Sequence, residues 1–335
     1  MRFWHRHSNT VESTILQQFR QWLEKGYGLY SLEMETRRMR ASSFRAGRVS
    51  YGSTRQDNGF HRRLVGPESN GIPSLSPVNE VETPNQLQKD PEDRFTWEFR
   101  KHNFTLMALW SQFLVSSTER VINGSTTGGF DLHLDRVDPN WSKNLPLIDY
   151  AIFSDAHWFF RQNYLYENGK LLGCIYCQAP NVSSLEPGLA IRKAFRASFR
   201  AINDCKNCRK IFSFLRTYSP SHFEHGTWNN GGGCNRTRPT ERDEIVDESG
   251  PDLEYRKIQV EEIEIAKSSG EESGNIFEVL DVTKIMSMRR DGHPGIHWGN
   301  KWMKGYSDCI HWCLPGPVDV WNGLLFELIK RQIRV

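Results

Sequence analysis

The chain has 335 residues, of which 25% are charged and 38% hydrophobic, an ordinary composition for a globular protein. Its net charge of +3 is too small to indicate a nucleic-acid partner. No stretch approaches the ~20 consecutive apolar residues that span a bilayer, and the N-terminal segment MRFWHRHSNT has no apolar signal core. The sequence therefore predicts neither nucleic-acid binding nor a transmembrane segment within this chain.

Residues 1–64 differ in composition from the rest. Arg recurs there among Ser and Gly with little strand patterning, and apolar residues at helical spacing predict one helix over Val11–Leu23. Residues 65–90 are rich in Pro, Ser, Asn and Gly, which is typical of a linker. We therefore predict a basic arm and linker over residues 1–80, partly disordered, ahead of a globular domain over residues 81–335.

Apolar runs alternate with helical patterns in the rest of the chain. Strands are predicted at Phe104–Trp110, Ile148–Phe153, Ile211–Leu215 and Ile276–Leu280, and helices at Arg192–Asn203, Leu253–Lys267 and Val318–Ile333. The second of these helices is expected to carry its acidic residues on its outer face. The alternation predicts an α/β layered fold with a mostly parallel sheet. Ligands bind such sheets beyond the carboxyl ends of the strands, where the polar turns Ser154–His157 and Thr217–His222 fall.

The cysteines allow two interpretations. There are seven, at Cys174, Cys177, Cys205, Cys208, Cys234, Cys309 and Cys313. The first four form two Cys-x-x-Cys pairs with the ligand spacing of a zinc ribbon, and the same spacing permits disulfides. The separation between the pairs is longer than is usual for zinc sites, which favours disulfides. The last two flank His311, where a disulfide would hold a loop in place.

Five Asn-x-Ser/Thr sequons mark candidate glycosylation sites at Asn103, Asn123, Asn140, Asn181 and Asn235. Sequons together with cysteines favour a lumenal protein. The missing signal sequence points the other way. A chain shortened at its N-terminus would reconcile the two.

The segment 291–322 is rich in His, Trp, Gly and Pro, which predicts a structured loop. Within it Asp308 and His311 meet if the backbone turns once between them. The carboxylate then fixes the tautomer of the imidazole and raises the basicity of its other nitrogen. A base of that kind accelerates attack by a hydroxyl nucleophile by ~10²–10⁴. The alternative is a structural histidine bonded to Asp308.

The sequence from Gly299 to Asn322 closely resembles the C-terminal signature of plant trichome birefringence-like proteins, which are polysaccharide O-acetyltransferases. Four shorter stretches match in the expected order: His102–Met107, Ser154–Phe160, Arg216–Glu224 and Trp228–Thr237. The resemblance extends from about Val81 to the C-terminus. It is closest to the branch that acts on xyloglucan or glucomannan.

This resemblance implies an SGNH/GDSL-like (PC-esterase) α/β fold, a three-layer sandwich that is here N-terminally truncated and has long irregular loops. It implies a catalytic triad whose Asp and His are Asp308 and His311, and a disulfide between Cys234 and Cys309. Acetyl would pass from a serine to a hydroxyl of a cell-wall polysaccharide. The resemblance implies no cofactor, leaves the acetyl donor open, and places the protein in the Golgi lumen with a membrane anchor that this chain lacks.

The sequence departs from the family pattern in its N-terminal region. It contains no Gly-Asp-Ser, the family's nucleophile motif, and residues 1–80 do not resemble the family. Ser154 stands where some members carry an Asn-containing turn, so no oxyanion role is carried over to it. Three hypotheses follow: an O-acetyltransferase chain without its nucleophile, a polysaccharide-binding protein that has lost the chemistry, and a zinc-stabilised binding module with no acyl chemistry.

Overall fold

The computed structural model describes residues 49–51, 85–87, 95–99, 104–177, 179–240, 250–298, 305–313 and 316–333. Its larger sheet has seven strands in the order β11-β10-β7-β1-β4-β3-β2. Their bounds are Val49–Tyr51 (β1), Asn85–Leu87 (β2), Phe95–Phe99 (β3), Phe104–Ala108 (β4), Tyr150–Phe153 (β7), Phe212–Arg216 (β10) and Ile276–Leu280 (β11). Pairing is parallel from β11 through β4 and antiparallel among β4, β3 and β2. The predicted mostly parallel sheet is confirmed.

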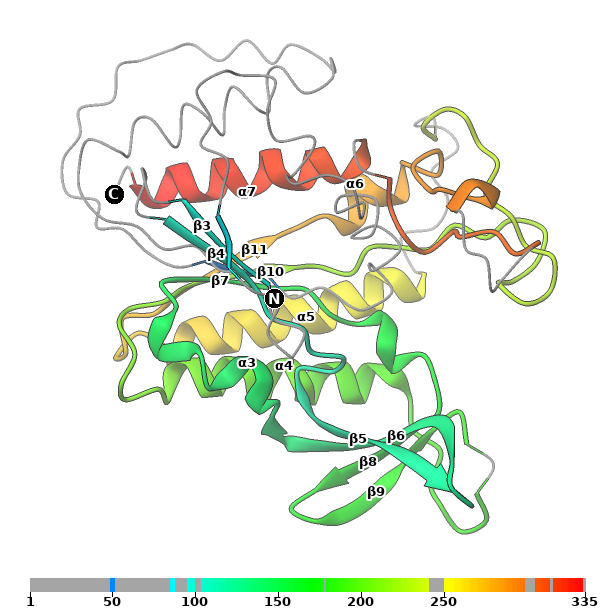
Figure 1. Cartoon of the computed structure of the whole chain (residues 1–335), viewed down its shortest axis with the longest axis horizontal. Coiled ribbons are helices and arrows are strands. Elements are labelled where there is room, and N and C mark those ends of the chain that lie inside the picture. The colour runs from blue at the N-terminus through cyan, green and yellow to red at the C-terminus, as the bar shows by residue number, and fades with distance from the viewer. Residues whose placement is uncertain are drawn as a thin grey trace.

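Helices cover both faces of this sheet. The longer ones are Pro187–Asn203 (α4), Pro251–Ser269 (α5) and Pro317–Ile333 (α7). Figure 1 shows α4 and α5 on one face and α7 on the other, so the layers run helix, sheet, helix. The shorter helical segments are Pro139–Ser142 (α3), Thr283–Ser287 (α6), Leu145–Leu147 (η3), His157–Phe159 (η4) and Ile296–Trp298 (η6). The expected three-layer α/β fold is therefore present.

The alternating direction of the side chains along β7 explains why helices cover both faces of the sheet. All four of its residues are buried, as expected for a central strand of a parallel sheet. Ala151 and Phe153 belong to the core under α4 and α5, whereas Tyr150 and Ile152 belong to the core under α7. Successive side chains point to opposite faces of a strand, so one apolar run supplies both cores.

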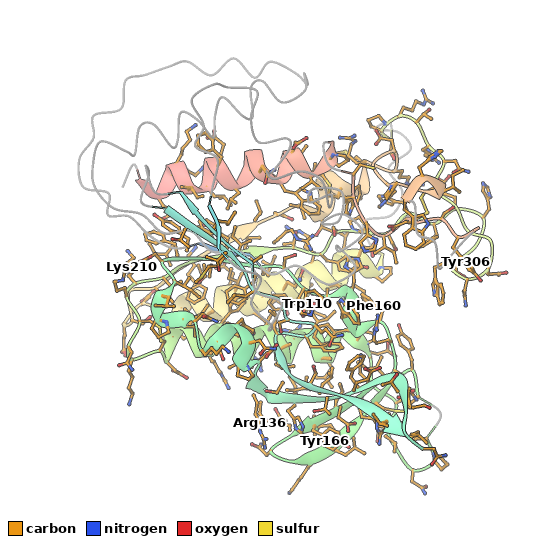
Figure 2. The ribbon with its side chains drawn as sticks, in the orientation of Figure 1. Trp110, Arg136, Phe160, Tyr166, Lys210 and Tyr306 are labelled. Atoms are coloured by element: carbon orange, nitrogen blue, oxygen red, sulfur yellow. A yellow bond between two sulfur atoms is a disulfide. The ribbon has the colours of Figure 1, made fainter. Side chains whose placement is uncertain are left out.

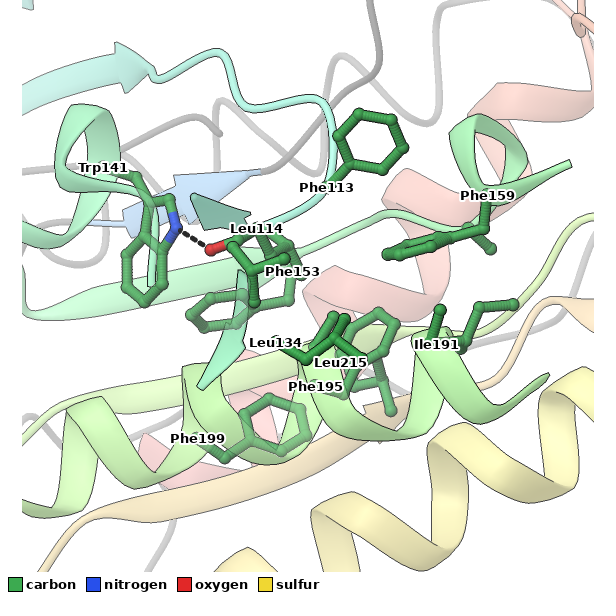
Figure 3. Packing of buried hydrophobic residues seen from close by; sticks show 14 of the residues in the cluster. Phe113, Leu114, Leu134, Trp141, Phe153, Phe159, Ile191, Phe195, Phe199 and Leu215 are labelled. Carbon is green, nitrogen blue, oxygen red and sulfur yellow. Dashed lines mark hydrogen bonds between the residues drawn. The ribbon is translucent and has the colours of Figure 1, made fainter. Parts of the chain in front are cut away.

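The larger core is dominated by aromatic side chains (Figure 3). Phe153 makes edge contacts with Trp141 and with Phe199 of α4, each at 5.6 Å between ring centroids. The indole Nε1 of Trp141 donates to the carbonyl oxygen of Leu114 at 2.8 Å. This bond satisfies the one polar atom of a fully buried tryptophan, so the ring adds apolar burial without an unpaired donor.

A second, four-stranded sheet was not predicted. It comprises Val115–Ile122 (β5), Ser125–Val137 (β6), Asn163–Glu167 (β8) and Lys170–Ile175 (β9), in the order β5-β6-β8-β9. Its hairpins turn at Asn123-Gly124 and Asn168-Gly169, where all four residues have φ between 50° and 78°. Asn-Gly is the strongest short-range signal for such turns, so both hairpins could have been predicted from the sequence. β6 packs against α4 through the buried Leu132 and Leu134.

Most of the expected arm and linker, including the helix over Val11–Leu23, lies outside the described residues. One short piece of it is described: β1 lies between β4 and β7 in the sheet. Just after residue 80, β2 pairs with β3. The boundary at residue 80 stays a prediction. Among the described helices, none combines the length and apolarity needed to cross a membrane.

The acidic face of α5 differs from the expectation. Glu262 of α5 is fully buried against α4, where its Oε2 accepts from Arg196 Nε at 2.8 Å. Its Oε1 accepts from Arg196 Nη2 at 2.7 Å and Arg192 Nη1 at 3.0 Å. Helical periodicity finds the apolar stripe, but it cannot find a carboxylate whose partners are about seventy residues away.

Replacing Arg196 by Ala is expected to lower the free energy of unfolding by roughly 2 to 4 kcal/mol, because a buried carboxylate loses a bidentate partner. Lys257→Ala is the matched control. Lys257 is exposed and its Nζ is 3.9 Å from Glu261, so its loss should cost about 0.5 kcal/mol or less. Urea unfolding measures both. Equal costs for the two variants would show that the Glu262 pair does not stabilise the contact of α4 with α5.

Candidate active site

The parallel strands place two polar turns side by side at the carboxyl ends of β7 and β10, which we call the carboxyl edge of the larger sheet. Leu215 of β10 pairs with Phe153 of β7, so the next residues, Arg216 and Ser154, are neighbours. Arg216 donates from Nε to Ser154 Oγ at 2.5 Å and from Nη1 to Ser219 Oγ at 2.9 Å. Its guanidinium also lies 4.6 Å from the ring centroid of Trp321 in α7. A cation is thereby held at the carboxyl edge, where sites in such sheets are expected.

A loop that ends at residue 313 is bound to this edge through its backbone. Asp308 and Gly295 exchange two hydrogen bonds, at 2.9 and 3.0 Å. The N–H of His222, which follows β10, donates to the carbonyl oxygen of Cys309 at 3.0 Å. A disulfide between Cys309 and Cys234 joins the same loop to the Gly-rich segment 219–234. The loop is therefore held from two directions although it has little regular secondary structure.

Asp308 and His311 make the contact that their spacing predicts. His311 Nδ1 lies 2.6 Å from Asp308 Oδ2, while Asp308 Oδ1 accepts from the backbone N–H groups of Ile310 and His311 at 3.1 and 3.0 Å. Burial would raise the pKa of Asp308, but the hydrogen bond from His311 and these N–H groups outweigh it, so the pKa is lowered. The carboxylate stays charged and fixes the tautomer in which Nε2 of the imidazole carries no proton. A catalytic role for the pair stays a prediction.

His157 lies in the polar turn after β7. Its ring stacks on Tyr218 at 4.8 Å between centroids. Burial, reinforced by the nearby Arg216, lowers the pKa of His157 to about 3. The turn was predicted from its position in the sequence, but no role was assigned to His157.

Two further histidines support the backbone of His311. His293 Nδ1 lies 2.7 Å from the carbonyl oxygen of His311 and therefore donates to it. That tautomer leaves Nε2 of His293 as an acceptor for His222 Nδ1, 2.9 Å away. Both rings pack against Trp312. Both histidines were predicted to lie in loops, but no local pattern connects them, because they are 71 positions apart.

The buried histidines should make stability depend on pH. Burial lowers the pKa of His222 to about 3 and also lowers the pKa of His293. The unfolded chain protonates these groups below about pH 6.5, whereas the folded chain resists protonation. The free energy of unfolding should therefore fall as pH drops from about 6.5 toward 3, with His222 contributing roughly 1 to 2 kcal/mol of that loss at pH 5.

Urea unfolding at pH 7 and pH 5 tests this dependence. His222→Asn should flatten it, and His297→Asn, at an exposed side chain, should not. An unchanged slope in His222→Asn would show that the His222–His293 contact does not carry the pH dependence.

The structure contains three disulfides: Cys174–Cys177, Cys205–Cys208 and Cys234–Cys309. The third is the pairing that the family resemblance implies. Among the described residues there is no group of three or more His, Cys, Asp or Glu that could hold a metal ion. Of the sequons, Asn123, Asn140, Asn181 and Asn235 have exposed side chains, while Asn103 lies outside the described residues. Glycosylation at any of them stays a prediction.

Removing the Cys234–Cys309 bridge should destabilise the protein far more than removing Cys205–Cys208. The first closes a separation of 75 residues and the second a separation of 3. Loop entropy predicts costs of roughly 4.5 and 1.5 kcal/mol for the paired Cys→Ser variants. Urea unfolding of both double variants provides the measurement. Equal losses would contradict the view that the long bridge restrains the loop of Asp308 and His311.

Comparison with known proteins identifies the class. An α/β sandwich with an Asp–His pair beyond the carboxyl ends of its strands is the arrangement of acyl-transfer hydrolases. Residues 74–328 match PC-Esterase, described as the GDSL/SGNH-like acyl-esterase family found in Pmr5 and Cas1p. The chain belongs to this family.

The chain is similar to several plant acetyltransferases. It is 55% identical over 256 residues to xyloglucan O-acetyltransferase 3 of Populus trichocarpa, covering 76% of this chain and 64% of that protein. It is 47% identical to xyloglucan O-acetyltransferase 2 of Arabidopsis thaliana and 38% identical to protein trichome birefringence-like 19 of the same species. These alignments cover 76% of this chain and 61% and 60% of those proteins, so the chain spans about three-fifths of its relatives.

Proposed function

We propose that this chain carries the acid–base half of an O-acetyltransferase site for cell-wall polysaccharide, with xyloglucan as the acceptor. The observation that carries the proposal is the Asp308–His311 contact at 2.6 Å beside the carboxyl edge of the sheet. The 55% identity to a xyloglucan O-acetyltransferase supports the acceptor. The disulfides and the exposed sequon residues support a lumenal, Golgi location.

In the proposed reaction an enzyme hydroxyl attacks the acetyl carbonyl, and His311 Nε2 takes its proton. The proton then passes to the group that leaves the donor. A sugar hydroxyl next attacks the acetyl ester, gives its proton to His311, and the enzyme hydroxyl recovers that proton. Asp308 stabilises the imidazolium at each stage. Arg216 is the cation placed to offset negative charge on the carbonyl oxygen, since it lies where the two polar turns meet.

The nucleophile limits what these residues can do alone. The 335 residues contain no Gly-Asp-Ser, the nucleophile motif of the trichome birefringence-like proteins that the chain resembles. We therefore propose that this chain transfers little acetyl by itself. The same observation favours the second candidate, a polysaccharide-binding protein without catalysis.

A single experiment separates the two candidates. The purified chain is given an activated acetyl ester, with and without a xyloglucan oligosaccharide. A working base should hydrolyse the ester, and His311→Ala and Asp308→Asn should each lower that rate by ~10²-fold or more. Acetylated oligosaccharide should stay at background. Hydrolysis that is unchanged in His311→Ala would leave the non-catalytic binder, and His311-dependent acetylation of the sugar would show that another hydroxyl acts as nucleophile.

A further inference from the structure

Two exposed aromatic side chains meet near the candidate site without belonging to either core. Trp228 is 54% exposed and Tyr306 is 41% exposed. Their ring centroids are 6.5 Å apart with an interplanar angle of 36°. Figure 2 shows Tyr306 in the loops beyond the sheet, well apart from Trp110 and Phe160. Two large rings that are exposed side by side form an apolar patch on the surface. Such a patch indicates a site of contact with a ligand or partner.

The turn that presents Trp228 is compact. The N–H groups of Asn230 and Gly232 both donate to the carbonyl oxygen of Thr227, at 3.2 and 3.0 Å. A Cβ at Gly226 would lie 2.3 Å from the Asn230 carbonyl oxygen, and one at Gly232 would lie 2.6 Å from Gly226. Only glycine permits this approach of backbone to backbone, so the Gly-rich run shapes the turn that carries the indole.

Tyr306 is fixed to the catalytic loop. Its carbonyl oxygen accepts from Trp298 Nε1 at 2.9 Å, and the Cys234–Cys309 disulfide joins its loop to that of Trp228. Tyr306 precedes Asp308 by two residues, so their Cα atoms are at most ~7 Å apart. The aromatic pair is therefore continuous with the candidate active site.

The charge around the pair selects the kind of ligand. Glu224, at the base of the Trp228 loop, is paired with Arg236 Nε at 2.7 Å and lies 3.6 Å from Arg290 Nη1. The neighbours of Trp228 in its turn are Thr227 and Asn229, which are polar and uncharged. The axial C–H face of a pyranose packs on flat aromatic rings, while its hydroxyl rim bonds to amides and hydroxyls. A neutral sugar chain therefore finds uncharged hydrogen-bonding groups beside the rings and no unpaired carboxylate at Glu224.

We propose that Trp228 and Tyr306 form a stacking platform for the neutral glycan backbone of the acceptor, adjacent to Asp308 and His311. The inference rests on the proposed function for the identity of the acceptor. The platform holds the polysaccharide in register while one hydroxyl is presented to His311. Because it acts in binding, it operates whether or not the chain transfers acetyl.

Binding of a xyloglucan oligosaccharide to the intact chain, measured by calorimetry, tests the platform. Trp228→Ala and Tyr306→Ala should each raise Kd by ~10-fold, corresponding to about 1.4 kcal/mol. Trp228→Phe and Tyr306→Phe keep a flat ring and should change Kd by only ~2- to 3-fold. Ile265→Ala, at an exposed apolar side chain of α5, is the matched surface control and should bind as the wild type does.

The outcomes separate the platform from the chemistry. The activated ester carries no glycan, so ester hydrolysis reports on the proposed function and Kd reports on the platform. Unchanged Kd in the Trp228→Ala, Tyr306→Ala double variant overturns the platform, as does a wild-type chain that binds no oligosaccharide. If the alanine variants do not fold, fluorescence decides: the ligand-induced change in tryptophan emission should disappear in Trp228→Phe, and its persistence overturns the proposal.

Discussion

Three hydrogen bonds meet on the buried carboxylate of Asp308: one involves the imidazole of His311, and two come from the backbone N–H groups that follow in the loop. The same bonds turn the chain and orient the imidazole, so the local fold of the loop also sets the geometry of the Asp308–His311 pair. The bonds also keep the carboxylate charged despite its burial. Around it, the disulfide at Cys309 and the paired backbone of Gly295 and Asp308 fix where the turn lies.

The electrostatics of the surrounding residues follow from their burial. His157 and His222 are neutral because a buried imidazolium is costly, and each neutral ring has a defined packing role. Arg216 remains the cation at the carboxyl edge, tied to Ser154 and Ser219.

Several elements were predictable because their signals are local. The strand Ile276–Leu280 has the predicted bounds, and α7 begins one residue before its predicted start. The helix predicted at Arg192 begins instead at Pro187, since Pro at the first helical position was not used as a start signal. The smaller sheet was missed because its strands are only half buried and lack a continuous apolar run. The buried Glu262 could not be predicted, because its partners come from another helix.

The sequence by itself determined the alternation of strands and helices, the Asp308–His311 spacing and the family to which the chain belongs. These depend on periodicity and on residues close together in the chain, where side-chain directions repeat with the backbone. Only the tertiary structure decided that Ser154, Arg216 and the His311 loop share one edge, that His222 supports His293, and that Trp228 meets Tyr306. Contacts across tens of residues depend on strand register and on the Cys234–Cys309 bridge, and neither leaves a pattern in the linear sequence.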